Sequence, residues 1–137
     1  LKQKLRLPED LPGLARRRLT DRFVASLQMA RKAGQLLTGA QRVRDALERG
    51  EVLALITATD AAEDGRGKML SALRGRQKAA EEAGFAAPPV PHLELLDSTQ
   101  LGLAFGLESV IHAALVNGAA SQSALERANR LARYMDN

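Results

Sequence analysis

Residues 64–68 read Asp-Gly-Arg-Gly-Lys, a run of glycines and lysine that suggests a phosphate-binding loop. A P-loop has Gly, four residues, Gly-Lys and then Ser or Thr, so that backbone N–H groups surround the phosphates and the hydroxyl meets magnesium. In this chain Ala62 stands at the first glycine position and Met69 at the hydroxyl position. We therefore predict no nucleotide site here.

The other residue types that support catalysis are scattered along the chain. His92 and His112 each lie in an apolar, strand-like segment, and neither has the further ligands nearby that a metal site requires. Glu63 and Asp64 are neighbours on a helix, so their carboxylates point in different directions and form no acid–base pair. No motif marks a serine or threonine as an activated nucleophile. We expect no enzyme activity, no metal and no cofactor.

The distribution of charge points to a class of partner. The chain carries 20 Lys and Arg against 16 Asp and Glu. Residues 1–44 hold eleven basic and three acidic residues, a net charge of +8, whereas the remainder holds nine basic and thirteen acidic residues, a net charge of −4. This pattern is typical of a polyanion binder, because Lys and Arg placed against phosphates release condensed counterions. The alternative is a solvated basic surface.

Composition narrows the fold and the compartment. Three Phe, one Tyr and no Trp predict an aliphatic core and leave no aromatic platform on which single-stranded bases could stack. The absence of Cys excludes disulfides and thiolate metal sites and agrees with a cytoplasmic location. No run approaches the ~18 apolar residues of a membrane span. We expect a soluble cytoplasmic protein that does not contact a membrane.

The order of apolar patterns predicts the fold. Residues 1–13 contain two prolines and a glycine without a sustained period, so they are expected to be an extended leader or linker, or the tail of a preceding domain. Residues 14–137 are expected to form one domain with the order helix, short strand, helix, strand, helix, strand, helix, strand, helix. Such alternation predicts a three-layer α/β/α sandwich, in which helices cover both faces of a mixed four-stranded sheet.

Two strands and one helix have clear signals. Phe23, Leu27 and Ala30 recur at the helical period and predict the buried face of the first helix. The unbroken apolar run at residues 52–58 predicts a central strand. The prolines within residues 88–91 predict an edge position for the short strand that follows them, because proline cannot donate to a ladder.

Three polar signals predict helix starts. Thr38 and Gln41 have the spacing of a capping box for the second helix. Asp60 is in position to cap the third helix, which glycines are expected to interrupt. Asp97 and Gln100 repeat the capping-box spacing before a short fourth helix.

Several short motifs, taken together, resemble one family. They are Ala30-Arg31-Lys32-Ala33-Gly34, Thr38-Gly39-Ala40-Gln41, Ala46-Leu47-Glu48-Arg49-Gly50, Ala58-Thr59-Asp60 and Leu101-Gly102-Leu103-Ala104-Phe105-Gly106. In order and spacing they resemble the kink-turn RNA-binding family of archaeal ribosomal large-subunit protein seven-Ae and eukaryotic large-subunit protein thirty-e, over residues 19–135. The resemblance implies an α/β/α sandwich that binds structured RNA through the start of its second helix.

The resemblance also assigns the binding residues. Gly39 would let the backbone approach a phosphate at the helix start, where N–H groups and the helix dipole favour an anion. Gln41 and Arg42 match positions that contact bases, Arg49 matches a basic contact, and residues 107–110 match the loop that packs on an unstacked nucleotide. We expect the basic residues Arg31, Lys32 and Arg44 to add phosphate affinity. The expected RNA-binding residues are therefore Arg31, Lys32, Gly39, Gln41, Arg42, Arg44, Arg49, Leu107 and Val110.

The sequence departs from the family pattern at the centre of this site. The family usually has Asn and Glu at the positions of Gln41 and Arg42, and Lys at the position of Asp45. A carboxylate that faces a phosphate is repulsive, which argues against a standard kink-turn. Simpler roles remain open: Gln41 as a cap, Arg42 and Arg44 as a solvated face, and the two apolar loop residues as core.

A second resemblance concerns residues 1–12, which are similar to the tail of the bacterial YlxR-like nucleic-acid-binding domain. That domain precedes a domain of this kind in some proteins and is associated with transcription termination, which implies a longer polypeptide before Leu1. We expect structured RNA, ribosomal or nascent, as the partner, together with transcription or ribosome-associated proteins. The alternatives are a protein-interaction domain in a transcription or translation complex, and a recognition domain detached from an RNA-modifying enzyme.

Overall fold

The computed structural model describes residues 2–84 and 89–135, with the side chains of the first helix described from Gly13 onward. The elements follow the predicted order. They are α1 (Lys2–Lys32), β1 (Leu36–Thr38), α2 (Ala40–Glu48), β2 (Val52–Thr57), α3 (Glu63–Glu82), β3 (His92–Leu93), α4 (Ser98–Leu103), β4 (His112–Val116) and α5 (Ala119–Met135). Pro88, part of the predicted approach to β3, lies outside the described residues.

The four strands form one mixed sheet with the order β1-β4-β2-β3. β4 pairs antiparallel with both β1 and β2, and β2 pairs parallel with β3. The predictions for β2 as a central strand and for β3 as an edge strand are both confirmed. Pro91, directly before β3, accepts a hydrogen bond from the N–H of Leu55 through its carbonyl oxygen, a role that needs no N–H donor.

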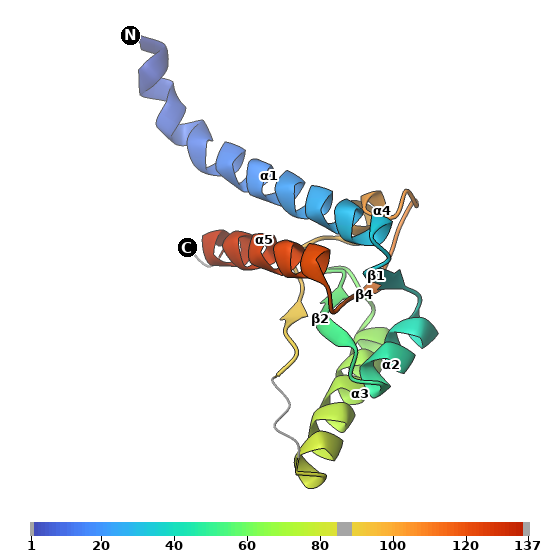
Figure 1. Cartoon of the computed structure of the whole chain (residues 1–137). Helices are drawn as coiled ribbons and strands as arrows, with labels where there is room; N and C mark the ends of the chain where they lie inside the picture. Colours follow the sequence, from blue (N-terminus) through green and yellow to red (C-terminus); the bar gives the residue numbers. More distant parts are fainter. Residues whose placement is uncertain (1, 85–88, 136–137) are drawn as a thin grey trace.

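Helices cover both faces of the sheet, which confirms the α/β/α sandwich (Figure 1). α1, α4 and α5 bury Phe23, Leu101 and Leu131 against one face, and α2 and α3 bury Leu47 and Met69 against the other. Neighbouring residues of β2 alternate between the two cores, as the period of a strand requires.

A register shift between Val52 and Ala54 interrupts this alternation in β2. As a result Val52 and Leu55, three residues apart, both belong to the core under α2 and α3. Without the shift, Val52 would face the opposite core.

α1 begins at Lys2, so the extended conformation predicted for this stretch is wrong over residues 2–13, which are helical. Lys and Leu recur in this stretch beside single Gln and Arg residues, and all four residue types have high helix propensity. A helix already formed downstream also extends without a new nucleation step. The described contacts of α1 with the core begin at Leu19 and Phe23.

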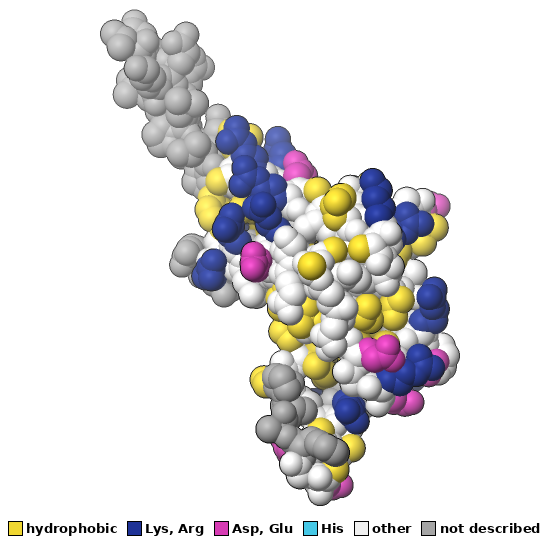
Figure 2. Space-filling view, in the orientation of Figure 1, with side chains coloured by type: hydrophobic (Ala, Val, Ile, Leu, Met, Phe, Trp, Pro, Cys, Tyr) yellow, Lys and Arg dark blue, Asp and Glu magenta, His cyan; other side chains and the backbone are white. Residues whose placement is uncertain are grey.

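α1 and α5 run antiparallel, side by side, in one layer (Figure 1). Gln35, which follows α1, caps the first turn of α5: its Oε1 accepts from the Ser121 N–H at 3.0 Å. Gly118 lies so close that a Cβ there would overlap the Gln35 side chain. Figure 2 shows Lys and Arg side chains gathered along the described part of α1 and beside α5. Within the described ranges, no helix combines the length and apolar character needed to cross a bilayer.

Candidate nucleic-acid interface

One end of the sheet brings together segments that are distant in the sequence. β1, β2 and β3 run in one direction and β4 in the other, so the carboxyl ends of the first three lie beside the start of β4. The start of α2, the β2–α3 loop and the α4–β4 loop therefore meet there. Ligands of open α/β sheets bind at such strand ends. We call this surface, formed by residues 39–44, 58–62 and 106–111, the loop end.

Gly39 begins α2 in a conformation that favours glycine, with φ 98° and ψ 129°. Among the described side chains, none caps this helix. The predicted capping box is therefore wrong: the Thr38 hydroxyl donates to the carbonyl oxygen of His112 at 3.0 Å and fastens β1 to β4 instead. An uncapped helix start presents backbone N–H groups and the positive end of the dipole to solvent, which suits an anion.

The first two turns of α2 carry a polar network. Gln41 Nε2 donates to Asp45 Oδ1 at 2.9 Å, and Arg44 Nη2 donates to Gln41 Oε1 at 3.0 Å. The Asp45 carboxylate, which the sequence suggested would repel a phosphate, is thus half-buried and bound to Gln41. Arg42 is exposed, and its guanidinium forms no ion pair with any residue of the described ranges. Arg42 is therefore a cation at this helix start that is free to meet a phosphate.

The β2–α3 loop is fastened to α4 by Asp60. Its carboxylate accepts from the Ser98 N–H at 2.8 Å and from the Ser98 hydroxyl at 2.6 Å. These hydrogen bonds lower the pKa of Asp60. The prediction that Asp60 caps α3 is wrong, because Ala62 is the N-cap and the Asp60 side chain turns the other way. α3 also continues through its glycines without a break.

The α4–β4 loop is held at both ends by backbone hydrogen bonds. Asp97 and Gln100 form the predicted capping box at the start of α4. The Leu107 N–H donates to the Gly102 carbonyl oxygen, and the Val110 N–H donates to that of Ser98, each at 3.0 Å. These hydrogen bonds fix the loop on α4, an arrangement that reduces the conformational entropy a loop loses when it binds a partner.

Two of the apolar residues predicted to touch RNA have different surroundings. Leu107 is 53% exposed and stands at the surface of the loop end. Val110 is 5% exposed and belongs to the core, so its side chain cannot pack on a nucleotide and the prediction for it is wrong. Sequence reasoning missed Leu103 and Ile111, which are 57% and 38% exposed and flank the same loop. The position of Leu103 on the polar side of α4 is the signal that could have revealed it.

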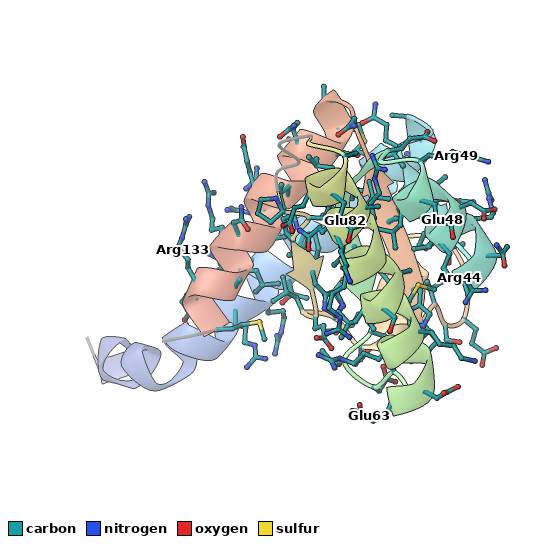
Figure 3. All side chains as sticks on the ribbon, turned by 90° about the horizontal axis from the view of Figure 1, so that it is seen from below. Arg44, Glu48, Arg49, Glu63, Glu82 and Arg133 are labelled. Atoms are coloured by element: carbon teal, nitrogen blue, oxygen red, sulfur yellow. The ribbon has the colours of Figure 1, made fainter. Side chains whose placement is uncertain are left out.

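The outer basic residues divide between the two ends of the sandwich. Arg31 and Lys32, at the end of α1, line a depression with Leu103 and Gly106 and so border the α4–β4 loop. Arg49 lies at the opposite end of α2 from Gly39 and approaches Glu51 at 3.9 Å. Figure 3 shows Glu63 at the start of α3 and Glu82 at its end, with Arg44 midway along α2 and Arg49 just beyond its end. The structure does not bring Arg49 to the loop end.

A chain of polar side chains lies beside the loop end and runs from the partly exposed Arg66 and Glu94 to the buried Thr57. Arg66 donates two hydrogen bonds to Glu94, at 2.9 and 2.8 Å, and these bonds lower the pKa of Glu94. His92 lies 3.5 Å from Glu94 on one side and 2.8 Å from the Thr57 hydroxyl on the other. Burial lowers the pKa of His92 despite this carboxylate.

His112 is adjacent, and its buried Nδ1 has no hydrogen-bond partner among the described residues. Burial, together with the nearby His92 and Arg44, lowers the pKa of His112. Among the residues described, no three His, Asp or Glu side chains gather as a metal site would require. Thr57, whose hydroxyl is within hydrogen-bond reach of His92, is 0% exposed and so out of reach of a substrate.

The fold is similar to those of solved structures. A protein of unknown function from Bacillus halodurans C has a TM-score of 0.60 at 22% identity, over 85% of this chain and 98% of its own. The Giardia lamblia 15.5kD RNA binding protein has a TM-score of 0.56 at 18% identity, over 85% of this chain and 90% of its own. No family model matches this chain. No curated protein matches it either.

Proposed function

We propose that this domain binds structured RNA through the loop end. The observation that carries the proposal is the juxtaposition of an uncapped helix start, an unpaired Arg42 and the exposed Leu107 on loops that hydrogen bonds hold rigid. The name of a protein with a similar fold, the Giardia lamblia RNA binding protein, supports RNA as the partner.

Each part of the loop end has a distinct task in this proposal. A phosphate lies at the start of α2, where Gly39 leaves room for it and the free N–H groups donate. Arg42 binds a second phosphate or a base edge, and its fork of donors suits either. Leu107, with Leu103 and Ile111 beside it, covers the face of an unstacked base. RNA is read in this way at loops and bulges, where bases leave the stack.

The finer assignment follows from the family resemblance. We propose ribosomal or nascent RNA as the target, with a link to transcription termination through the YlxR-like segment. In the free protein, Gln41 hydrogen-bonds to both Asp45 and Arg44 and so orients Arg44. Gln41 would contact a base only after one of these hydrogen bonds breaks. Arg31 and Lys32 add phosphate contacts beside the α4–β4 loop.

We also propose that the domain acts by binding and not by catalysis. The His92 ring, with Thr57 and Glu94 on its two sides, has the order of a nucleophile, base and carboxylate. The hydroxyl is fully buried, however, and the arrangement joins β2 to β3 and α3. Its role in this proposal is to hold the sheet end on which the loops stand.

Binding of the full chain to fluorescent RNAs tests the proposal. The RNAs are a kink-turn, a stem with an internal bulge and a plain duplex of equal length. We expect the purified protein to prefer one of the two irregular RNAs, and Arg42→Gln to reduce that affinity by about tenfold, the typical effect of removing one specific hydrogen-bonding group.

Lys78→Gln, an exposed charge on α3, is the matched control and should change affinity by less than about twofold. Equal binding of all three RNAs, or equal losses in Arg42→Gln and Lys78→Gln, would contradict the proposal. A melting temperature unchanged from the parent shows that each variant is folded.

The exposed Leu103 and Leu107 favour one alternative, a protein-interaction surface at the same end. Apolar side chains this exposed mark protein contacts as well as base contacts. Leu107→Ser separates the two functions. A loss of RNA affinity comparable to that of Arg42→Gln supports RNA, and intact RNA affinity with loss of a transcription or ribosome-associated partner supports the alternative.

A further inference from the structure

We infer that the α1/α5 layer carries a second RNA-contact surface, which takes the phosphate backbone of a duplex segment. The surface is a groove between the two helices, away from the loop end. Its lining combines small side chains with two arginines and one methionine. The small residues are Ala25 and Ser26 of α1 with Ala119, Ala120 and Ser123 of α5, the arginines are Arg22 and Arg127, and the methionine is Met29.

Helix geometry adds two further arginines to the same groove. Arg18 precedes Arg22 by one turn of α1, and Arg130 follows Arg127 by nearly one turn of α5. Because the two helices run antiparallel, both additions extend the groove in the same direction. Four arginines from two helices therefore lie toward one end of the groove, and Figure 2 shows basic side chains along the described part of α1 and beside α5.

The two helical layers differ sharply in charge. α1 from Gly13 onward has six basic residues and one acidic residue, and α5 has three and one, so this layer carries +7. α2 and α3 together have seven basic and six acidic residues, a net charge of +1. The basic excess recognised in the sequence is thus concentrated, within the described residues, on the layer that does not carry α2.

The arginines of the groove also lack partners of opposite charge. Arg18, Arg22, Arg127 and Arg130 form no ion pair with any described carboxylate. On α3, Arg66 binds Glu94 and Lys68 binds Asp64, while Arg74, Arg76 and Lys78 likewise form no ion pair with a described carboxylate. Unpaired cations on two neighbouring helices repel one another, and a polyanion that lies across them lowers this electrostatic repulsion. This charge complementarity points to phosphate.

The residue types that line the groove favour duplex RNA over single-stranded nucleic acid and over an anionic lipid surface. Alanines and serines offer no ring on which a single strand could stack. An amphipathic helix enters a lipid interface with several large apolar side chains, whereas Met29 is the one large apolar residue among the described residues that line this groove. Double-stranded RNA is recognised by shape and by backbone contacts, which arginines on two rigid helices provide.

α1 connects this groove to the loop end. Its last turn holds Arg31 and Lys32, which border the α4–β4 loop. Basic residues thus continue along one helix from the groove to the proposed recognition site. The inference rests on the proposed function in this respect: one RNA would place its irregular element at the loop end and a helical arm along α1 and α5.

The test compares two double variants of the full chain that each remove two positive charges. Arg22→Gln/Arg127→Gln alters the groove, and Arg74→Gln/Lys78→Gln alters exposed residues of α3 on the opposite layer. Each is titrated across a salt series with the preferred irregular RNA carrying either a short or a long duplex arm. Melting temperatures confirm the fold of every variant.

We expect the long arm to increase the affinity of the parent protein, and the groove variant to abolish that increase. Its salt slope with the long-armed RNA should be smaller in magnitude by about 2, one for each phosphate that the variant no longer neutralises. The α3 variant should retain both the increase and the slope. Arg42→Gln with the short-armed RNA reports separately on the loop end, so failure of one surface is distinguished from failure of the other.

Two outcomes would overturn the inference. One is an affinity that does not depend on arm length, or that falls equally in the two double variants. The other is loss of binding to phosphatidylserine vesicles in the groove variant while its binding to long-armed RNA is intact, because the arginines would then serve a membrane surface.

Discussion

Gly102 lies where a methyl group has no room. A Cβ at this position would stand 2.6 Å from the carbonyl oxygen of Leu107 and 3.0 Å from that of Glu108. Both atoms belong to the backbone of the α4–β4 loop, which cannot swing away as a flexible side chain does. Gly102 therefore allows this loop to lie directly on α4 and sets the position of Leu107.

The substitution Gly102→Ala is expected to reduce the free energy of unfolding by about 1–3 kcal/mol, the cost typical of overpacking a filled site. It should also weaken RNA binding, because the loop must move to admit the methyl group. Gly75→Ala is the control on α3, where a Cβ meets nothing within 4 Å. That change should stabilise the protein by about 0.5–1 kcal/mol, since Ala favours helix interiors over Gly. Urea unfolding and RNA titration of both variants check the prediction, and equal behaviour of the two would refute it.

The role of a single residue could be predicted only where its residue type, without its position in the fold, indicated a function. Arg42 became a candidate because it matches a position at which members of the resembled family contact bases. The sequence could not separate Leu107 from Val110, since both are apolar and three residues apart, and only the path of the loop decides that one is exposed and the other buried. The path of the chain also decides the partner of Asp60, whose residue type is typical of an N-cap. Asp60 was predicted to cap α3, but it binds the first residue of α4.

The elements themselves were largely predictable. Apolar period and length indicated the order of helices and strands, and the prolines placed β3 at the edge. The shift in β2 was not predictable, because all its residues up to Ile56 are apolar and no alternation exists to be broken. The extent of α1 was also missed, since two prolines outweighed the helix propensity of their neighbours in the prediction.

His92 and His112, the first residues of β3 and β4, are expected to make the stability of the fold depend on pH. Burial lowers the pKa values of His92 and His112 from the ordinary value of 6.5. As the pH falls below 6.5, the unfolded chain takes up protons that the folded chain still refuses, so stability decreases. The lowered pKa of Glu94 adds a separate loss of stability, which begins only as the pH falls through 4.5, the ordinary value of that group.

We predict that the melting temperature falls between about pH 7.5 and pH 5.5, before the carboxylates titrate. The variant His92→Gln/His112→Gln should have a lower melting temperature at neutral pH, through loss of packing, but a flatter profile across this range. Calorimetry at several pH values measures both. A double variant whose profile is as steep as that of the parent would show that other groups cause the dependence.

On the scale of the whole molecule, the two helical layers differ in net charge, and this difference suggests separate surfaces for long-range electrostatic attraction and for short-range contact. If the domain binds RNA as proposed, a layer of +7 would attract the RNA from a distance, within the range that salt permits, and the loop end would make the short-range contacts. The basic excess was visible in the sequence through residues 1–44, but the pairing of α1 with the arginines of α5 is a property of the fold.

This division predicts different kinetics for the two sets of variants. Arg22→Gln/Arg127→Gln should slow association several-fold at low salt and lose this effect as salt rises, because it removes long-range attraction. Arg42→Gln should chiefly speed dissociation, because it removes a close contact. Stopped-flow fluorescence with the preferred RNA measures both rates, and the same rate constant changing in both variants would contradict the division.

The pairing of α1 with α5 also affects how the protein is made. α1 precedes every strand and α5 follows every strand of the described sheet, yet the two pack on each other in one layer. During translation, Phe23 and Leu27 are synthesised long before Leu131, so their apolar surface stays open while the rest of the domain emerges. Such surface invites aggregation and chaperone binding. The nascent chain thus remains in need of protection until α5 has left the ribosome, and only then does this side of the sheet close.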